Sequence, residues 1–422
     1  MPDVSIRSFE HNLFERWADR VLRLASMAGL SFTDLRPESI LRAAQRGTRL
    51  TDFGDERFRE PMRRSLQVVA DGPYTSLGRS FIRGVIVRLA RHRLHIEQWF
   101  KDHPETSQIS IQRPIFVLGF PRSGTTLLQN LLEQAPNRRA LRFWELTNPV
   151  PEHDEPSRDR ASRLRRARRD LMWAYRFVPE MEEMHEVRAD TVEECWPLLA
   201  NTYAVLNFDI CHGLRPYGDW LMKQDMGWAY REYRRQLQLL LWRERVDQLV
   251  LKCPEHLWFL DSLLETFPDA CIVWTHRDPL DSVASYSSLI SLSRRTLQGR
   301  IDPHKIGPHI ADRFQEGVSR AMAARLAHGD ESRFFDVHFD DLVHDPVGVT
   351  NRVEEHFGLD PTDRRLLEDW LSKKRGDAPG RHRYVPEMWN LDHESIREQF
   401  AEYIDRFHVA VSDETARMPG AS

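Results

Sequence analysis

Four short apolar segments, each followed by an amphipathic helical pattern, constrain the fold of this chain more than any other feature. They are PIFVLG (114–119), QLVLKC (248–253), ACIVWTH (270–276) and RFFDVHF (333–339). Apolar runs of this length are typical of buried strands, and a strand that leads into a helix is the repeating unit of a parallel sheet. The sequence therefore predicts an α/β fold, with a parallel sheet flanked by helices.

The chain outside these units is predicted to be mostly helical. Apolar residues at helical spacing from Leu13 to Leu24 predict a helix that ends near Gly29. A second helix is expected near residues 81–93, and its basic side is expected to face solvent. That side carries Arg83, Arg88, Arg91 and Arg93. The charged interval at about 147–246 is predicted to be a helical insertion that forms a lid beside the sheet. These features divide the chain into a helical N-terminal region, 1–112, and an α/β domain, 113–422.

Composition limits the class of protein. The 422 residues include 60 basic and 64 acidic side chains and carry a net charge of −4, so the overall charge does not favour a nucleic-acid partner. No apolar run approaches the length of a membrane span or a signal peptide, so we expect a soluble chain that is at most peripheral to a membrane. The four scattered cysteines lack the paired spacing of a zinc site and indicate reduced thiols in the cytoplasm.

The first predicted strand leads into the loop GFPRSGTT (119–126), which has the spacing of a phosphate-binding loop. Gly119 and Gly124 permit a tight turn, and the backbone N–H groups at the start of the next helix favour an anion there. Further donors can come from the hydroxyl groups of Ser123, Thr125 and Thr126. A nucleoside triphosphatase carries lysine where this chain has Thr125, whereas Arg122 supplies a cation inside the loop. The pattern predicts a P-loop-like sheet that binds a phosphate other than the end of a triphosphate.

A second anion site is predicted at the end of the third apolar segment. In THRDPLDSVASYSSL (275–289), Arg277 ends the strand and Ser285 lies two turns into the following helix. Their guanidinium and hydroxyl groups are expected to hold a further phosphate. The strand reaches Arg277 before Asp278, so no carboxylate stands in the usual position of a magnesium ligand and we expect no metal. The two sites together predict a nucleotide with a charged group on its 5′ phosphate.

These motifs resemble those of the sulfotransferases that use 3′-phosphoadenosine 5′-phosphosulfate (PAPS). PRSGTTLL (121–128) looks like the 5′-phosphosulfate loop of that family, in the arginine form of the tyrosylprotein enzymes and many bacterial members. THRDPLDSVAS (275–285) resembles the 3′-phosphate motif of the family. Three further segments resemble a late strand, a lysine-bearing strand with its helix, and a C-terminal loop that closes over the nucleotide. They are HFDDLVHDP (338–346), VLKCPEHLWFLDSL (250–263) and GRHRYVPEMWNLD (380–392).

The resemblance covers most of residues 114–407 and implies a role for each matching position. It implies that the 5′ end of the nucleotide is bound by Arg122, Ser123, Gly124, Thr125 and Thr126. It also implies that Arg277 and Ser285 bind the 3′ phosphate, that Phe339 packs near the adenine, and that Arg381 belongs to the closing loop. The chain departs from the family in having no evident RKG-type 3′-phosphate loop near Gly380.

Sulfuryl transfer builds negative charge on the leaving phosphate, so cations aimed at that phosphate stabilise the transition state. Arg122 and Lys252 are predicted to do this. The acceptor hydroxyl must lose a proton to a base, and the resemblance points to Glu145 in RRALRFWELTNP (138–149). The apolar residues beside Glu145 are expected to raise its pKa toward the working range. His185 and His256 are the alternative bases.

We therefore predict a cytoplasmic sulfotransferase that uses PAPS without a metal and acts on a hydroxyl group of a small molecule, a lipid or a sugar. Tryptophans in and near the insertion suit any of these acceptors, so the sequence leaves the acceptor open. Two alternatives remain, a kinase of the phosphate-loop class and a non-catalytic nucleotide-binding protein. Magnesium-dependent binding of ATP would favour the kinase.

Overall fold

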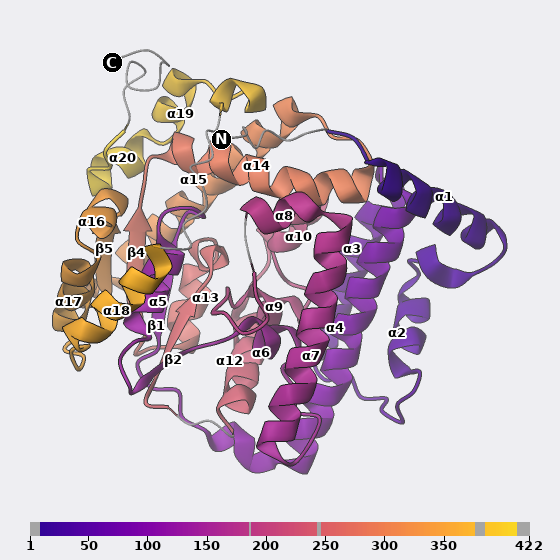
Figure 1. Ribbon diagram of the computed structural model, residues 1–422, viewed down its shortest axis with the longest axis horizontal. Helices are drawn as coiled ribbons and strands as arrows, with labels where there is room; N and C mark the ends of the chain where they lie inside the picture. Colours follow the sequence, from indigo (N-terminus) through magenta and orange to yellow (C-terminus); the bar gives the residue numbers. More distant parts are fainter. Residues whose placement is uncertain (1–8, 185–186, 243–245, 376–384, 412–422) are drawn as a thin grey trace.

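The computed structural model describes residues 9–184, 187–242, 246–375 and 385–411, and it contains one five-stranded sheet (Figure 1). The strands are β1 (Ile115–Gly119), β2 (Arg138–Ala140), β3 (Gln248–Lys252), β4 (Cys271–His276) and β5 (Phe334–His338). Their order is β2-β3-β1-β4-β5, and every neighbouring pair is parallel. The predicted α/β fold is confirmed. The edge strand β2 is an addition, because three residues are too few to leave an apolar run in the sequence.

Helices cover both faces of the sheet because successive side chains of a strand point to opposite sides. Ile115 and Val117 of β1 pack into a smaller core with α5 and α17, whereas Phe116 and Leu118 pack into the larger core of the molecule. The helices that follow the strands or lie C-terminal to them are α5 (Thr125–Leu132), α6 (Phe143–Thr147), α13 (Leu260–Thr266), α14 (Pro279–Gln298), α15 (Pro303–His328), α16 (Phe339–His344), α17 (Pro346–His356), α18 (Arg364–Arg375), α19 (His393–Gln399) and α20 (Ala401–Phe407).

Most of the remaining helices contribute to the larger core. Those of the N-terminal region are α1 (Leu13–Met27), α2 (Pro37–Gln45), α3 (Arg59–Asp71) and α4 (Ser76–Asp102). Those between β2 and β3, beyond α6, are α7 (Pro156–Phe177), α8 (Pro179–Met184), α9 (Trp196–Ala200), α10 (Asn207–His212), α11 (Arg215–Leu221) and α12 (Gly227–Leu241). Helices α1–α4 and α7 lie at the right of Figure 1. The two groups share one core, in which the Phe58 and Tyr203 rings lie 5.8 Å apart. Among the described residues, no helix is both long and apolar enough to cross a bilayer.

One expectation for the N-terminal region was wrong. Arg93 of α4 does not face solvent but is buried, with 3% of its surface exposed. Its guanidinium donates to the carbonyl oxygens of Phe53 at 2.8 Å and Asn201 at 3.2 Å. The sequence alone does not show whether an arginine of a helix faces solvent or donates to buried carbonyl groups, because both kinds of arginine occur in amphipathic helices.

Candidate active site

The carboxyl ends of the central strands bring most of the predicted site residues to one edge of the sheet. In the register, Gly119 lies beside Thr275, and Val117, two residues before the end of β1, lies beside Lys252. The loop after β1 therefore has Lys252 on its β3 side and the residues after β4 on the other. Open parallel sheets bind ligands at this edge, where connections from neighbouring strands leave in opposite directions.

The loop has a shape that only glycine permits at two positions. Gly119 has φ of +145°, and an added Cβ would lie 2.2 Å from Oγ1 of Thr275. Gly124 has φ of +88°, and its Cβ would lie 2.8 Å from Cδ2 of Leu342 in α16. Arg122 also has a positive φ, +72°, which is uncommon for a residue with a side chain. Packing from β4 and α16 thus imposes a fixed path on the backbone between Gly119 and Gly124.

The buried side chain of Ser123 stabilises this backbone path. Its hydroxyl donates to the carbonyl of Phe120 at 2.6 Å and lies 2.6 Å from Oγ1 of Thr275, and the residue is fully buried. Thr275 was not identified from the sequence. Because the Ser123 hydroxyl is already engaged within the protein, its predicted contact with the nucleotide stays a prediction.

The start of α5 presents hydrogen-bond donors without protein acceptors. Within the described part of the chain, the backbone N–H groups of Gly124, Thr125 and Thr126 make no hydrogen bond to another residue. The Arg122 side chain beside them is exposed. Free N–H groups, the positive end of a helix dipole and a cation together make a site for an anion. The loop therefore fits the 5′ phosphosulfate that the sequence predicts.

Lys252 ends β3 directly beside the loop. Its Nζ donates to Oγ1 of Thr126 at 3.1 Å and to Oε1 of Glu194 at 3.1 Å, and Oε1 of Glu193 lies 3.9 Å away. Burial by itself lowers the pKa of an ammonium, but the two carboxylates outweigh it and hold the pKa of Lys252 above its ordinary value. Lys252 is therefore charged at neutral pH, although only 1% of its surface is exposed. Glu193 and Glu194 were missed in the sequence because no motif connects TVEECW (191–196) with β3.

Arg277 reaches the loop from the other side. Its Nη1 donates to the carbonyl oxygen of Arg122 at 2.6 Å, its guanidinium carbon lies 4.2 Å from the centroid of the Phe339 ring, and Asp281 lies 3.5 Å away. Phe339 also touches the loop, since a Cβ on Gly124 would lie 3.3 Å from its Cδ2. These residues border a hollow of about 400 Å³. It is lined by His276, Arg277, Asp278, Asp281, His338, Phe339, Asp340, Asp341, His408, Val409 and Ala410.

The remaining predicted residues either form no hydrogen bond with the phosphate loop or lie outside the described residues. Ser285 is buried in α14, with 3% of its surface exposed, two turns after Arg277. His256 is fully buried, and its ring nitrogens lie 2.9 Å from the hydroxyl of Tyr230 and 3.4 Å from Sγ of Cys195. Such engagement is typical of a structural histidine. Arg381 and His185 lie outside the described residues, so their predicted roles stay predictions.

Glu145 lies in α6, after the edge strand β2, and is 3% exposed. Its Oε2 accepts the backbone N–H of Arg142 at 2.9 Å, and its Oε1 forms an ion pair with Arg139. The apolar setting expected from the sequence is therefore only half correct, because a guanidinium lies against the carboxylate. Within the described residues the contacts of this carboxylate lead to β2 and α6 and not to the loop or Lys252.

A second, small cavity lies behind the loop and has a volume of about 20 Å³, room for about one water molecule. It is lined by Pro121, Glu194, Leu206, Asn207, Ile210, Cys253, Pro254, Glu255, Trp258, Tyr286 and Phe314. The carboxyl of Glu255 accepts the backbone N–H of Leu206 at 2.5 Å. Burial raises the pKa of Glu255 to about 8, so this carboxyl keeps its proton at neutral pH. The cavity wall is thus mostly apolar and aromatic, and the carboxyl that Glu255 contributes to it is protonated.

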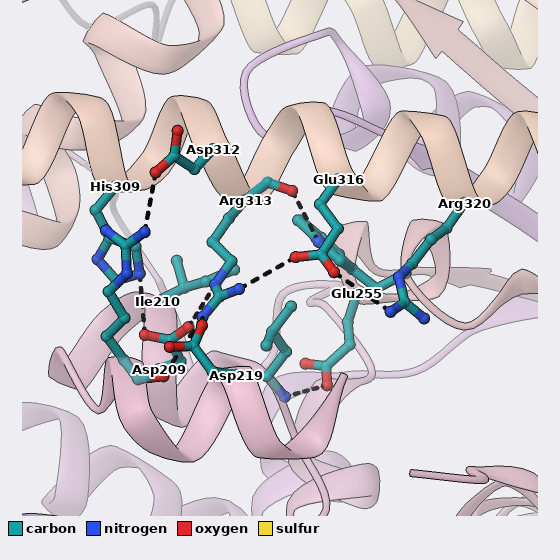
Figure 2. Close-up of polar contacts among 12 residues, drawn as sticks. Asp209, Ile210, Asp219, Glu255, His309, Asp312, Arg313, Glu316 and Arg320 are labelled. Carbon is teal, nitrogen blue, oxygen red and sulfur yellow. Dashed lines mark hydrogen bonds and ion pairs between the residues drawn. The ribbon is translucent and has the colours of Figure 1, made fainter. Parts of the chain in front are cut away.

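An ion-pair network holds the α10 wall of this cavity against α15 (Figure 2). Nε of Arg313 donates to Asp209 at 2.7 Å, and its Nη atoms reach Asp219 at 2.5 Å and Glu316 at 3.1 Å. His309, one turn before Arg313, lies 3.1 Å from Asp209. Removing one partner from such a buried network is costly, because the other charge is left without compensation. The network therefore sets the position of the neighbouring cavity residues of α10.

Comparisons with known proteins agree with this geometry. A model described as "Sulfotransferase family" matches residues 114–363. The structure of sulfotransferase STF1 from Mycobacterium tuberculosis H37Rv has a TM-score of 0.77 and 30% identity, over 87% of this chain and 98% of that one. STF9 from Mycobacterium avium has a TM-score of 0.77 and 26% identity, over 89% and 97% of the two chains. A further relative, the omega-hydroxy-beta-dihydromenaquinone-9 sulfotransferase Stf3 of Mycobacterium tuberculosis (strain CDC 1551 / Oshkosh), is 26% identical over 313 residues, 70% of this chain and 74% of Stf3.

The family match includes the phosphate loop, Lys252 and Arg277, which the structure brings to one edge of the sheet. It decides between sulfuryl transfer and the two alternatives left open by the sequence, a kinase and a non-catalytic binding protein. Since the matched segment is more than half of the chain, this protein belongs to the sulfotransferase family and is an enzyme that transfers a sulfuryl group.

Proposed function

We propose that the enzyme transfers the sulfuryl group of PAPS to a hydroxyl group of an apolar small molecule or lipid. The observation that carries this proposal is the set of free N–H groups at the start of α5, between the charged Lys252 and Arg277. PAPS, when bound, supplies the activated sulfuryl group. The loop residues from Arg122 to Thr126 would hold its 5′ end, with Arg277 and Ser285 toward the 3′ phosphate and Phe339 near the adenine.

Lys252 is suited to stabilise charge on the leaving phosphate. It is buried, charged and linked to Thr126, so its ammonium is already in place before the phosphate gains charge. A preorganised cation in a dry site contributes more than one in water, because nothing has to reorient during the reaction. Arg122 adds a second cation from the solvent side of the loop.

Two carboxylates are candidates for the base that takes the acceptor proton. Glu145, which the sequence favoured, is already engaged by Arg139 and by the N–H of Arg142. Glu194 lines the small cavity beside Pro121 and contacts Lys252, so it adjoins both the loop and the cavity in which we place the acceptor. We propose Glu194 as the base and keep Glu145 as its rival, since a base must lie within hydrogen-bond reach of the proton that it removes.

A pair of matched variants separates these candidates. We expect Glu194→Gln to lower turnover by about 10²–10⁴, the usual contribution of a placed base, and Glu145→Gln to lower it by less than about tenfold. Binding of 3′-phosphoadenosine 5′-phosphate, measured by calorimetry, checks that either variant still forms the nucleotide site. A larger loss of turnover in Glu145→Gln than in Glu194→Gln would identify Glu145 as the base instead.

The small cavity indicates the class of acceptor. Its apolar and aromatic lining from α10, α14 and α15 suits a hydrocarbon or an aromatic ring better than a sugar. The relative Stf3 is named for a dihydromenaquinone derivative, which is consistent with such an acceptor. The cavity is too small for any of these, so we propose that the insertion at about 147–246 acts as a lid that opens for the acceptor, supported by the helices of residues 1–112.

The test is transfer of radioactive sulfate from labelled PAPS to a panel of isoprenoid alcohols, hydroxylated quinones, phenols and sugars, each with and without a chelator. We expect labelled products from the apolar alcohols or phenols, and the same yield after chelation. Labelling of sugars alone would refute the apolar acceptor. Loss of all transfer on chelation would refute the metal-free site that the sequence predicts.

A further inference from the structure

Helix α1 directs several of its large apolar side chains away from the protein. Its inner side, which packs on α4, consists of Glu15, Ala18 and other partly buried residues. On the opposite side, Leu13 is 85% exposed, Trp17 62% and Leu24 57%. The spacing of these residues places them on one stripe of the helix. A single exposed leucine is ordinary, but a row of large apolar residues on one exposed side calls for a partner.

More exposed apolar residues lie in α1 and just after it. Val21 belongs to the stripe, and Leu30 and Phe32 follow the end of α1; they are 44%, 53% and 50% exposed. We call Leu13, Trp17, Val21, Leu24, Leu30 and Phe32 the outer apolar face. Helix α1 lies at the margin of the molecule, at the end away from the sheet (Figure 1). The face is therefore open to a large, flat partner.

The exposed charged residues of α1 beside the outer apolar face are arginines. Arg16, Arg20 and Arg23 follow one flank of the stripe and are exposed. Arg16 pairs with Glu10, whereas Arg20 and Arg23 make no hydrogen bond or ion pair within the part of the chain that the structure describes. The acidic residues of α1 turn inward, where Glu15 accepts from Thr296 at 2.9 Å and Asp19 from the N–H of Leu77 at 2.8 Å.

We propose that the outer apolar face docks on the surface of an anionic phospholipid bilayer, with α1 lying in the plane of the interface. Large apolar residues that include tryptophan, next to a row of arginines, are the features of helices that bind in this way. A second copy of the chain fits less well. A two-fold contact through this face would bring the arginines of both copies together, and like charges oppose association.

This inference goes beyond the proposed function and does not depend on which acceptor the enzyme uses. It concerns a surface built from α1 and the residues just after it, which shares no residue with the phosphate loop, Lys252 or Arg277. Variants of the outer apolar face should therefore change membrane binding and leave binding of 3′-phosphoadenosine 5′-phosphate as it is. That difference keeps a failure of this inference distinct from a failure of the proposed function.

Flotation with lipid vesicles tests the inference. We expect the full chain to float with vesicles that contain phosphatidylglycerol, and much less with pure phosphatidylcholine or at high salt. The triple variant Leu13→Ser, Trp17→Ser and Leu24→Ser should bind at least about tenfold more weakly, because it removes the largest apolar anchors. Leu326→Ser is the matched control. Leu326 lies on α15 and is 70% exposed, and its replacement should leave flotation unchanged.

A second variant, Arg20→Glu with Arg23→Glu, should abolish the preference for anionic vesicles and retain the folded state in a urea titration. Several results would overturn the inference. They are no flotation of the full chain with anionic vesicles, equal flotation with both vesicle types, or undiminished binding by the triple variant. A dimer of the full chain without lipid, together with a monomeric triple variant in sedimentation velocity, would show that the face binds a second copy instead.

Discussion

The protonated carboxyl of Glu255 makes a quantitative prediction about stability. Its pKa is raised from 4.5 to about 8, and burial is the main cause. Between these two pH values the folded protein keeps the proton and the unfolded chain loses it. Stability must therefore fall as pH rises through this window, by up to about 1.4 kcal/mol per pH unit. The shift as a whole corresponds to a loss of about 3–5 kcal/mol by the alkaline end.

Glu255→Gln removes this titration. The amide keeps an oxygen that can accept the N–H of Leu206, so the variant should fold in the same way. We expect wild type and variant to have similar free energies of unfolding near pH 4.5. The variant should become more stable than wild type as pH rises, by about 3–5 kcal/mol above pH 8.

Urea titrations followed by circular dichroism, at intervals from pH 5 to pH 9, measure this difference. Glu355→Gln is the control, because Glu355 is exposed on α17 and its replacement should shift the whole profile little. Parallel profiles for wild type and Glu255→Gln would show that Glu255 is ionised in the folded protein. That result would refute the assignment of a neutral carboxyl to the wall of the small cavity.

Two further variants test the loop and its support. Gly124→Ala combines an unfavourable φ of +88° with a contact of 2.8 Å between the new Cβ and Leu342. We expect urea titration to show about 1–3 kcal/mol of destabilisation and calorimetry to show a loss of nucleotide binding. An unchanged affinity for the nucleotide would show that the loop adapts to the added methyl group. Arg277→Ala should weaken the binding of 3′-phosphoadenosine 5′-phosphate by about 1.5–3 kcal/mol. It should weaken the binding of adenosine 5′-phosphosulfate by less. Some loss is expected for this nucleotide too, because Arg277 also donates to the carbonyl oxygen of Arg122 in the loop. Equal losses for the two nucleotides would mean that Arg277 acts through the loop alone.

The parts of the site that follow one another in the chain could be predicted from the sequence. The apolar run of β1, the glycines of the loop and the helix after it are local features, since backbone conformation depends first on neighbouring residues. Arg277 could be predicted in the same way, because it directly follows β4 and only the position of the strand end had to be known. Because parallel strands align their carboxyl ends, locating the strands was enough to expect that these residues meet.

Contacts between distant segments could not be predicted in this way. Glu194 lies 58 residues before Lys252 and meets it only because the chain between β2 and β3 folds back over the sheet. The burial of Arg93 and the strand β2 also depend on tertiary packing. Arg139 is only six residues from Glu145, but no motif in the sequence indicated that the two side chains form an ion pair. The sequence by itself determined the four strands other than β2, the phosphate loop and the family. Only the tertiary structure decided which carboxyl groups are paired and that Glu255 is neutral, because burial depends on how segments far apart in the chain pack together.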